Sequence, residues 1–261
     1  MAIFCPLASG SKGNALLLGT ERTKILIDAG LSFKQLKERL EKLNIDVGSI
    51  DAVVITHEHS DHIKGVEVLA KQLNIPVIAN SDTAKALCEQ ITTLPKFKIF
   101  STGEMFEFGD ISLHPFSIQH DTVDPVAFTA RLAGKKIGIC ADLGCVTSLV
   151  KMHLKSCDVL YLESNHEPSM VHASMRPMVY KQRVLGRQGH LSNQSCAELL
   201  KELYHKDLKK IYLAHLSEEC NNPEVALKWT KESLQPYVDQ VSIDIALQHH
   251  VSQPFTWACS R

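Results

Sequence analysis

The feature that most constrains this chain is a cluster of four side chains of metal-binding type within six positions. The cluster consists of His57, His59, Asp61 and His62. It directly follows residues 51–56, which contain a short apolar run, and precedes residues 63–73, whose apolar positions have helical spacing. Imidazole nitrogens and carboxylate oxygens are ligands of divalent metals. Because crowding such groups costs free energy unless a cation compensates them, the cluster predicts a metal site where a strand turns into a helix.

Three further candidate ligands each stand just after an apolar run. They are His120, Asp142 and His215. The runs before them are 111–118, 137–141 and 211–214, which we expect to be strands. In α/β folds, ligand sites gather at the carboxyl ends of strands, so we expect these residues to complete the site.

Bulk composition is that of an ordinary globular protein. The chain has 261 residues, of which 44% are hydrophobic and 22% charged, and we expect one domain over residues 1–261. A net charge of −1 excludes a general electrostatic attraction to nucleic acid or membrane, so any basic surface is local. Without a predicted signal segment or membrane span, and with eight scattered cysteines, we expect reduced thiols, a cytoplasmic location and no membrane partner. The oligomeric state is not predicted.

The motifs, taken in order, resemble those of metallo-β-lactamase-fold hydrolases. The matching positions, which run over nearly the whole chain, are Asp28, the 57–62 cluster, His120, Asp142 and His215. More narrowly, residues 9–14, 163–166, 189–193 and 215–217 resemble the YycJ (WalJ) branch of that superfamily, whose members are regarded as DNA exonucleases.

This resemblance implies a fold and a ligand set. The fold would be α/β (α+β), a four-layer αβ/βα sandwich with two divalent metal ions (Zn, Mn or Fe) at the edge between its sheets. One ion would be held by His57, His59 and His120, and the other by Asp61, His62 and His215. Asp142 would bridge the two ions, and Asp28 would orient a histidine ring. Such a pair of ions can share a hydroxide and clamp a phosphate.

A second region bears on the substrate. Residues 168–197 contain no Asp or Glu and carry the basic side chains Arg176, Lys181, Arg183 and Arg187. The stretch fits cations placed along a phosphate backbone, and it fits equally well an exposed loop and helix of unremarkable charge. The Gly/Ser-rich residues 9–14 fit a tight turn better than a phosphate loop.

Two histidines of this region are candidates for contact with the substrate. His190 would bind a phosphate or protonate the leaving oxygen, and His166 would face the site. The candidate catalytic residues are Asp61, from the 57–62 cluster, and His190. His166, Arg176, Arg183, Arg187 and His190 are the candidate substrate-binding residues.

The leading expectation is hydrolysis of phosphodiester bonds at DNA ends. Within hydrolases, a small-molecule phosphodiesterase or a glyoxalase-like thioester hydrolase remains an alternative, and thioester hydrolysis would not need the basic stretch. A third alternative from another class is an iron-dependent oxygenase. The short gap between Asp142 and His215 counts against the large RNA-maturation enzymes of the superfamily.

Overall fold

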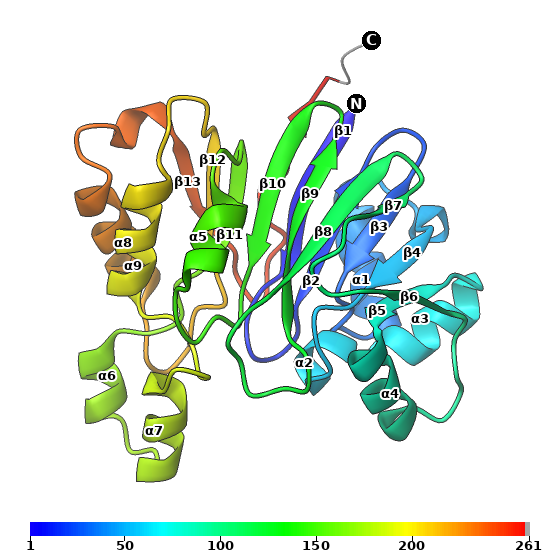
Figure 1. Cartoon of the computed structure of the whole chain (residues 1–261), viewed down its shortest axis with the longest axis horizontal. Coiled ribbons are helices and arrows are strands. Elements are labelled where there is room, and N and C mark those ends of the chain that lie inside the picture. Colours follow the sequence, from blue (N-terminus) through cyan, green and yellow to red (C-terminus); the bar gives the residue numbers. More distant parts are fainter. Residues whose placement is uncertain (259–261) are drawn as a thin grey trace.

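Two seven-stranded sheets pack face to face in this computed structural model, which describes residues 1–258 (Figure 1). Residues 259–261, with Cys259, lie outside the described part. The first sheet has the order β14 (Phe255–Trp257), β1 (Ala2–Ala8), β2 (Ala15–Gly19), β3 (Lys24–Ile27), β4 (Ala52–Val54), β5 (Val77–Asn80) and β6 (Phe97–Phe100). The second has the order β13 (Ser242–Ile245), β12 (Lys210–Ala214), β11 (Val159–Glu163), β10 (Lys135–Cys140), β9 (Val126–Leu132), β8 (Ile111–Ser117) and β7 (Phe106–Phe108).

Each sheet is antiparallel on one side and parallel on the other. In the first, β14, β1, β2 and β3 pair antiparallel, whereas β3 to β6 pair parallel. In the second, β7 to β10 pair antiparallel, whereas β10 to β13 pair parallel. The parallel strands β11 and β12 are buried along their whole length, as strands covered on both faces are.

Helices cover the outer faces of both sheets (Figure 1). Against the first sheet lie α1 (Phe33–Glu41), α3 (Val66–Leu73) and α4 (Ser81–Gln90). Against the second lie α5 (Ser148–Leu154), α8 (Asn193–Leu203) and α9 (Pro223–Ser233). The remaining helical segments are α2 (Ser60–Ile63), α6 (Pro168–Ala173), α7 (Met178–Leu185), η1 (Val47–Ser49) and η2 (Val238–Gln240).

Three hydrophobic cores separate the four layers. A central core joins the facing sides of the two sheets, and it includes Phe4, Phe128 and Tyr212. One outer core lies under α1, α3 and α4, and the other under α5, α8 and α9. The predicted α/β sandwich is therefore confirmed. None of the helices in residues 1–258 is long and apolar enough to cross a membrane.

The prediction of one helix over residues 63–73 is wrong, because two helices occupy this region. A short helix, α2, already begins at Ser60, and the chain breaks at Gly65 before α3 starts. At Gly65 the backbone passes so close to its neighbours that a Cβ atom would lie 2.0 Å from the carbonyl oxygen of Leu31. This close approach bends the chain, so Asp61 and His62 lie on a separate turn that faces the site.

Candidate metal centre

The candidate ligands converge at one edge of the sandwich, where strand ends from both sheets meet. Asp28 follows β3, Asp142 follows β10 and His215 follows β12. All three have a left-handed backbone, with φ of 62°, 54° and 53° respectively. Non-glycine residues seldom adopt this conformation, and it persists mainly where the surroundings impose it, often at functional sites.

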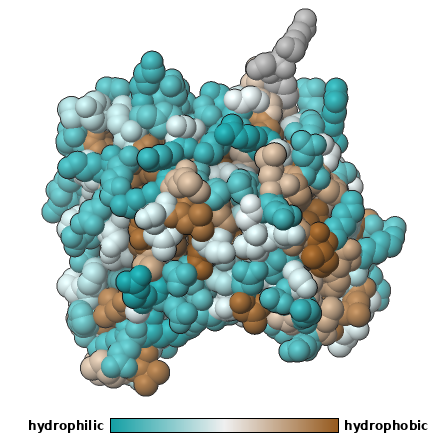
Figure 2. Space-filling view, in the orientation of Figure 1, coloured by the Kyte–Doolittle hydropathy of each residue, from teal (hydrophilic) through white to brown (hydrophobic). Residues whose placement is uncertain are grey.

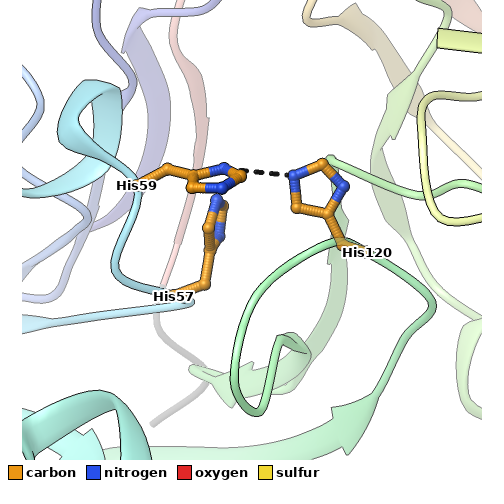
Figure 3. A group of neighbouring side chains, drawn as sticks. All are labelled: His57, His59 and His120. Carbon is orange, nitrogen blue, oxygen red and sulfur yellow. Dashed lines mark hydrogen bonds between the residues drawn. The ribbon is translucent and has the colours of Figure 1, made fainter. Parts of the chain in front are cut away.

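One group of ligands contains three histidines (Figure 3). His57 and His59 lie on the loop after β4, and His120 lies on the loop after β8 of the other sheet. Each of the three rings offers one nitrogen, and these three nitrogens lie within 4.8 Å of one another. His59 Nδ1 and His120 Nε2 are 3.3 Å apart. His120 Nδ1 donates to the carbonyl oxygen of Gly189 at 3.1 Å, which leaves Nε2 as the lone-pair nitrogen toward the site.

A second group contains Asp61, His62 and His215. Asp28 holds the His62 ring, because its Oδ2 atom lies 2.7 Å from His62 Nδ1. The same carboxylate accepts hydrogen bonds from the backbone nitrogen and the hydroxyl of Thr56, both at 2.9 Å. A carboxylate behind an imidazole sets its tautomer and raises its basicity, so His62 turns Nε2 toward the site.

Asp142 lies between the two groups. Its carboxylate oxygens lie 3.1 Å from His62 Nε2 and 3.8 Å from His120 Nε2. His215 Nδ1 is 3.5 Å away. One carboxylate therefore reaches ligands of both groups, as the resemblance implies for a bridging residue.

The donor set fits a cation. Among the described residues, three buried atoms at the centre of the site have no hydrogen-bond partner: His57 Nε2, Asp142 Oδ2 and His215 Nε2. Leaving buried polar atoms unpaired is costly, and a metal ion is the partner that accepts imidazole nitrogens and a carboxylate together.

The pKa shifts of the site residues also favour a bound cation. Burial raises the pKa of Asp142, but the surrounding histidines outweigh burial and hold it well below its usual range. Burial lowers the pKa of His57 well below its usual value, so this ring is a neutral ligand. Burial also opposes charge on His215, yet nearby carboxylates, Asp142 first, raise its pKa to about 10. A metal ion must displace that proton, so metal binding here is coupled to proton release.

A buried carboxylate that the sequence did not single out organises the site. Glu163, at the end of β11, lies with Oε1 2.8 Å from His190 Nδ1 and 3.1 Å from His215 Nδ1. Its Oε2 atom accepts backbone hydrogen bonds from Leu143 and Leu191. Burial raises the pKa of Glu163, but the histidines lower it to about 2, so the group is anionic. Its position at a strand end beside a histidine motif was the available signal.

Asn14 is a second residue that was missed. Its Nδ2 atom donates to Asp61 Oδ2 at 3.1 Å and lies 3.0 Å from His62 Nε2. The Gly/Ser-rich loop 9–14 therefore ends at the second ligand group. Ser9 of this loop accepts a hydrogen bond from the backbone nitrogen of His215 at 2.7 Å, which helps to hold that residue in its left-handed conformation.

The predicted substrate-binding residues fall into different environments. Arg176, Arg183 and His190 line one cavity of about 380 Å³ beside the site, and His166 and His190 line another of about 330 Å³. His166 is buried, and its Nδ1 atom has no hydrogen-bond partner within residues 1–258. Arg187 is exposed and lines neither cavity.

Two of these arginines are already paired with acidic residues from elsewhere in the chain. Arg183 Nε lies 2.5 Å from Asp121, the residue after His120, and Arg176 Nε lies 2.8 Å from Glu219. The acid-free stretch is thus less cationic in three dimensions than in sequence.

Fold and site together define the class of protein: a metal-dependent hydrolase. The chain belongs to the β-lactamase superfamily, since the family model described as "Beta-lactamase superfamily domain" matches residues 23–215.

Within the superfamily, this chain is similar to two bacterial exodeoxyribonucleases. It is 37% identical over 226 residues to exodeoxyribonuclease YycJ of Bacillus anthracis, with 85% of each chain covered. It is 38% identical over 225 residues to exodeoxyribonuclease WalJ of Streptococcus pneumoniae serotype 2, with 84% of this chain and 83% of the relative covered.

Solved structures agree on the fold. The metallo-β-lactamase fold protein YhfI from Bacillus subtilis aligns with a TM-score of 0.73 at 15% identity, over 97% of this chain and 100% of that one. Unliganded yeast PDE1 aligns with a TM-score of 0.71 at 14% identity, over 96% of this chain and 99% of that one.

Proposed function

We propose that this protein is a DNA exonuclease that hydrolyses phosphodiester bonds at strand ends with two divalent metal ions. One observation carries the proposal: the Asp142 carboxylate lies between two histidine-containing ligand groups, 3.1 Å from His62 and 3.8 Å from His120. The names of the two exodeoxyribonuclease relatives, which match most of this chain, support DNA as the substrate.

The two ligand groups would each hold one ion. His57, His59 and His120 form the first group, Asp61, His62 and His215 the second, and Asp142 would serve both. When bound, the ions would supply Lewis-acid activation of water at neutral pH and neutralise charge on the phosphate. The absence of cysteine from the set suits zinc, manganese or iron.

His190 is placed to act as the general acid. Glu163 holds its Nδ1 atom at 2.8 Å, which leaves Nε2 free to carry a proton. The ring is 15% exposed and lines both cavities beside the site, so a substrate can reach it. When the P–O bond breaks, the leaving oxygen would take this proton from His190 Nε2.

Arg183 would place the DNA backbone beside the metals. Its guanidinium is half-exposed, lines the 380 Å³ cavity and is paired with Asp121, next to His120. A phosphate that approaches this rim meets a cation already held in position.

The proposed location is the cytoplasm, because the seven cysteines in the described part of the chain are all free thiols.

A panel of substrates tests the proposal. Metal-loaded protein should release nucleotides from end-labelled duplex or single-stranded DNA, and His59→Ala should abolish the release. An end-labelled RNA, a chromogenic phosphodiester and a thioester are run in parallel, with Mn²⁺, Zn²⁺ and Fe²⁺. If DNA yields no nucleotides while the thioester or only the small phosphodiester is hydrolysed, the DNA exonuclease proposal fails.

A further inference from the structure

The helical hairpin formed by α6 and α7 has an apolar tip that nothing in residues 1–258 covers. Met175 is 100% exposed, Val179 76% and Met178 66%. The hairpin projects from the body of the molecule, and hydrophobic residues gather at its end (Figures 1 and 2). An exposed apolar cluster on a projection of a globular protein marks a contact surface.

Both ends of the hairpin connect to residues of the candidate site. The chain leaves β11 at Glu163, forms α6 and α7, and returns at His190, whose ring is bound to that same glutamate. A small core of Val171, Val184 and Cys220 holds the two helices together. Because Met175, Met178 and Val179 lie outside this core, they are not needed to fold the hairpin.

The tip lies more than one turn of α7 away from the residue of that helix that contacts the rim of the site. Arg183 on α7 is paired with Asp121 at the rim, and Met178 begins the same helix five residues earlier. At 1.5 Å per helical residue, Met178 lies about 8 Å along the axis from Arg183. Successive nucleotides of one strand are separated by about 3.4 Å, so this separation along the helix corresponds to about two base steps.

The chemistry around the tip favours a nucleic-acid end as its occupant. The residues from 168 to 197 contain no acidic side chain, and Lys181, three residues after Met178 on α7, bonds the carbonyl oxygen of His172 and forms no ion pair in the described part of the chain. Arg176 lies beside the tip with its guanidinium half-exposed and paired with Glu219. A polyanion is attracted by such cations, and Met and other apolar side chains are known to insert between base steps.

We propose that Met175, Met178 and Val179 form a wedge that stacks against the end base pair of duplex DNA and separates its strands. One strand is then free to enter the cavity lined by Arg183 and His190 and reach the metal centre. This inference rests on the proposed exonuclease function and adds a strand-separating element to it.

The test compares four substrates with one variant. The substrates are a blunt duplex, the same duplex with a mismatched end, the single strand, and bis(4-nitrophenyl) phosphate. The variant carries Met175→Ser, Met178→Ser and Val179→Ser. Its matched control carries Leu94→Ser, Met105→Ser and Met152→Ser, three similarly exposed apolar residues outside the hairpin.

The wedge variant should lose about tenfold or more in kcat/KM on the blunt duplex, because the substrate alone must then bear the cost of unstacking. Its rates on the mismatched duplex, the single strand and the chromogenic ester should match those of the wild type and the control. The salt dependence of DNA binding should also be unchanged, since no cation is removed.

An equal loss on all DNA substrates, or no loss on the blunt duplex, would overturn the wedge. A change of oligomeric state with an unchanged ratio of duplex to single-strand activity would assign the tip to contact between copies, and would also overturn it. Wild-type protein that cleaves the chromogenic ester but no DNA would instead refute the proposed function itself, and this outcome is seen before any variant is measured.

Discussion

At the scale of single residues, ordinary side chains become a metal site because of where strands end. The motif order was sufficient to predict which histidines and aspartates would meet, since each follows an apolar run and residues at strand ends share an edge. Glu163 escaped prediction because one carboxylate after a strand fits many roles. Only its contacts with His190 and His215 reveal that it positions both rings.

Replacing the central carboxylate should remove metal and activity together. We expect Asp142→Asn to lower hydrolysis by more than about 100-fold, because the loss of even outer contacts to metal ligands costs about 10- to 100-fold. Metal content after dialysis should fall in parallel, whereas the exposed Asp207→Asn should change neither. Full metal content with full activity in Asp142→Asn would exclude a bridging role.

Neutralising Glu163, the carboxylate that positions His190 and His215, should lower kcat. Glu163→Gln removes the anion that faces His190 Nδ1 at 2.8 Å and His215 Nδ1 at 3.1 Å. We expect kcat to fall by about 10- to 100-fold with a smaller change in KM, since ring orientation and basicity are lost rather than substrate contact. Steady-state kinetics on the chromogenic ester, with the exposed Glu104→Gln as the control, check this. An unchanged kcat would show that Glu163 is only a packing residue.

His166 should make the fold sensitive to mild acid. Burial lowers its pKa from 6.5 to about 4, so between these values the unfolded chain takes up a proton that the folded chain does not. The free energy of unfolding should therefore decrease as pH falls from 6.5 towards 4, by about 1.4 kcal/mol per pH unit for this one group. Denaturant titrations of wild type and His166→Gln should differ by this slope. Parallel pH profiles would show that His166 is readily protonated in the folded protein.

At the scale of elements, prediction was best where burial is continuous. Strand β12 is buried along its whole length, and the apolar run 211–214 predicts it closely. The hairpin of α6 and α7 was not predicted, because each helix buries only one residue and so leaves no periodic pattern. The break at Gly65 was missed because it depends on a tertiary approach to Leu31.

Gly30, between β3 and α1, should tolerate a side chain as poorly as Gly65 does. A Cβ atom at Gly30 would lie 1.6 Å from the backbone oxygen of Asp61, which belongs to the second ligand group. Gly30→Ala should destabilise the fold by about 1–3 kcal/mol by overpacking and shift Asp61 out of place. Chemical denaturation and metal content measure the two effects. Gly48→Ala, whose nearest contact would be a flexible side chain at 3.1 Å, serves as the control. If both variants behaved alike, the close approach at Gly30 would not matter.

At the scale of the whole molecule, the site joins the two sheets. His57 and His59 extend from the first sheet, whereas His120 extends from the second. The sandwich itself was predictable from the resemblance in motif order, and the line of contact between the sheets was not, because it depends on packing in the shared core.

Removing metal should therefore weaken the fold. An ion bound by the folded chain alone stabilises it by about 2.7 kcal/mol at a concentration 100 times the Kd, which is about 5–10 °C in Tm for a chain of this size. Chelation should lower the Tm by this order, and Asp142→Asn should show a smaller difference. An unchanged Tm after verified metal removal would mean that the site does not link the sheets.

The most direct test of the account is to count metal ions against exonuclease activity. Apo protein is titrated with Mn²⁺ or Zn²⁺, the bound metal per chain is measured, and nucleotide release from end-labelled DNA is followed at each step. The account predicts that activity rises with occupancy and reaches its maximum at two ions per chain, and that Asp142→Asn does not reach it. Nucleotide release that is complete without metal, or that never occurs at full occupancy, would contradict a two-metal DNA exonuclease.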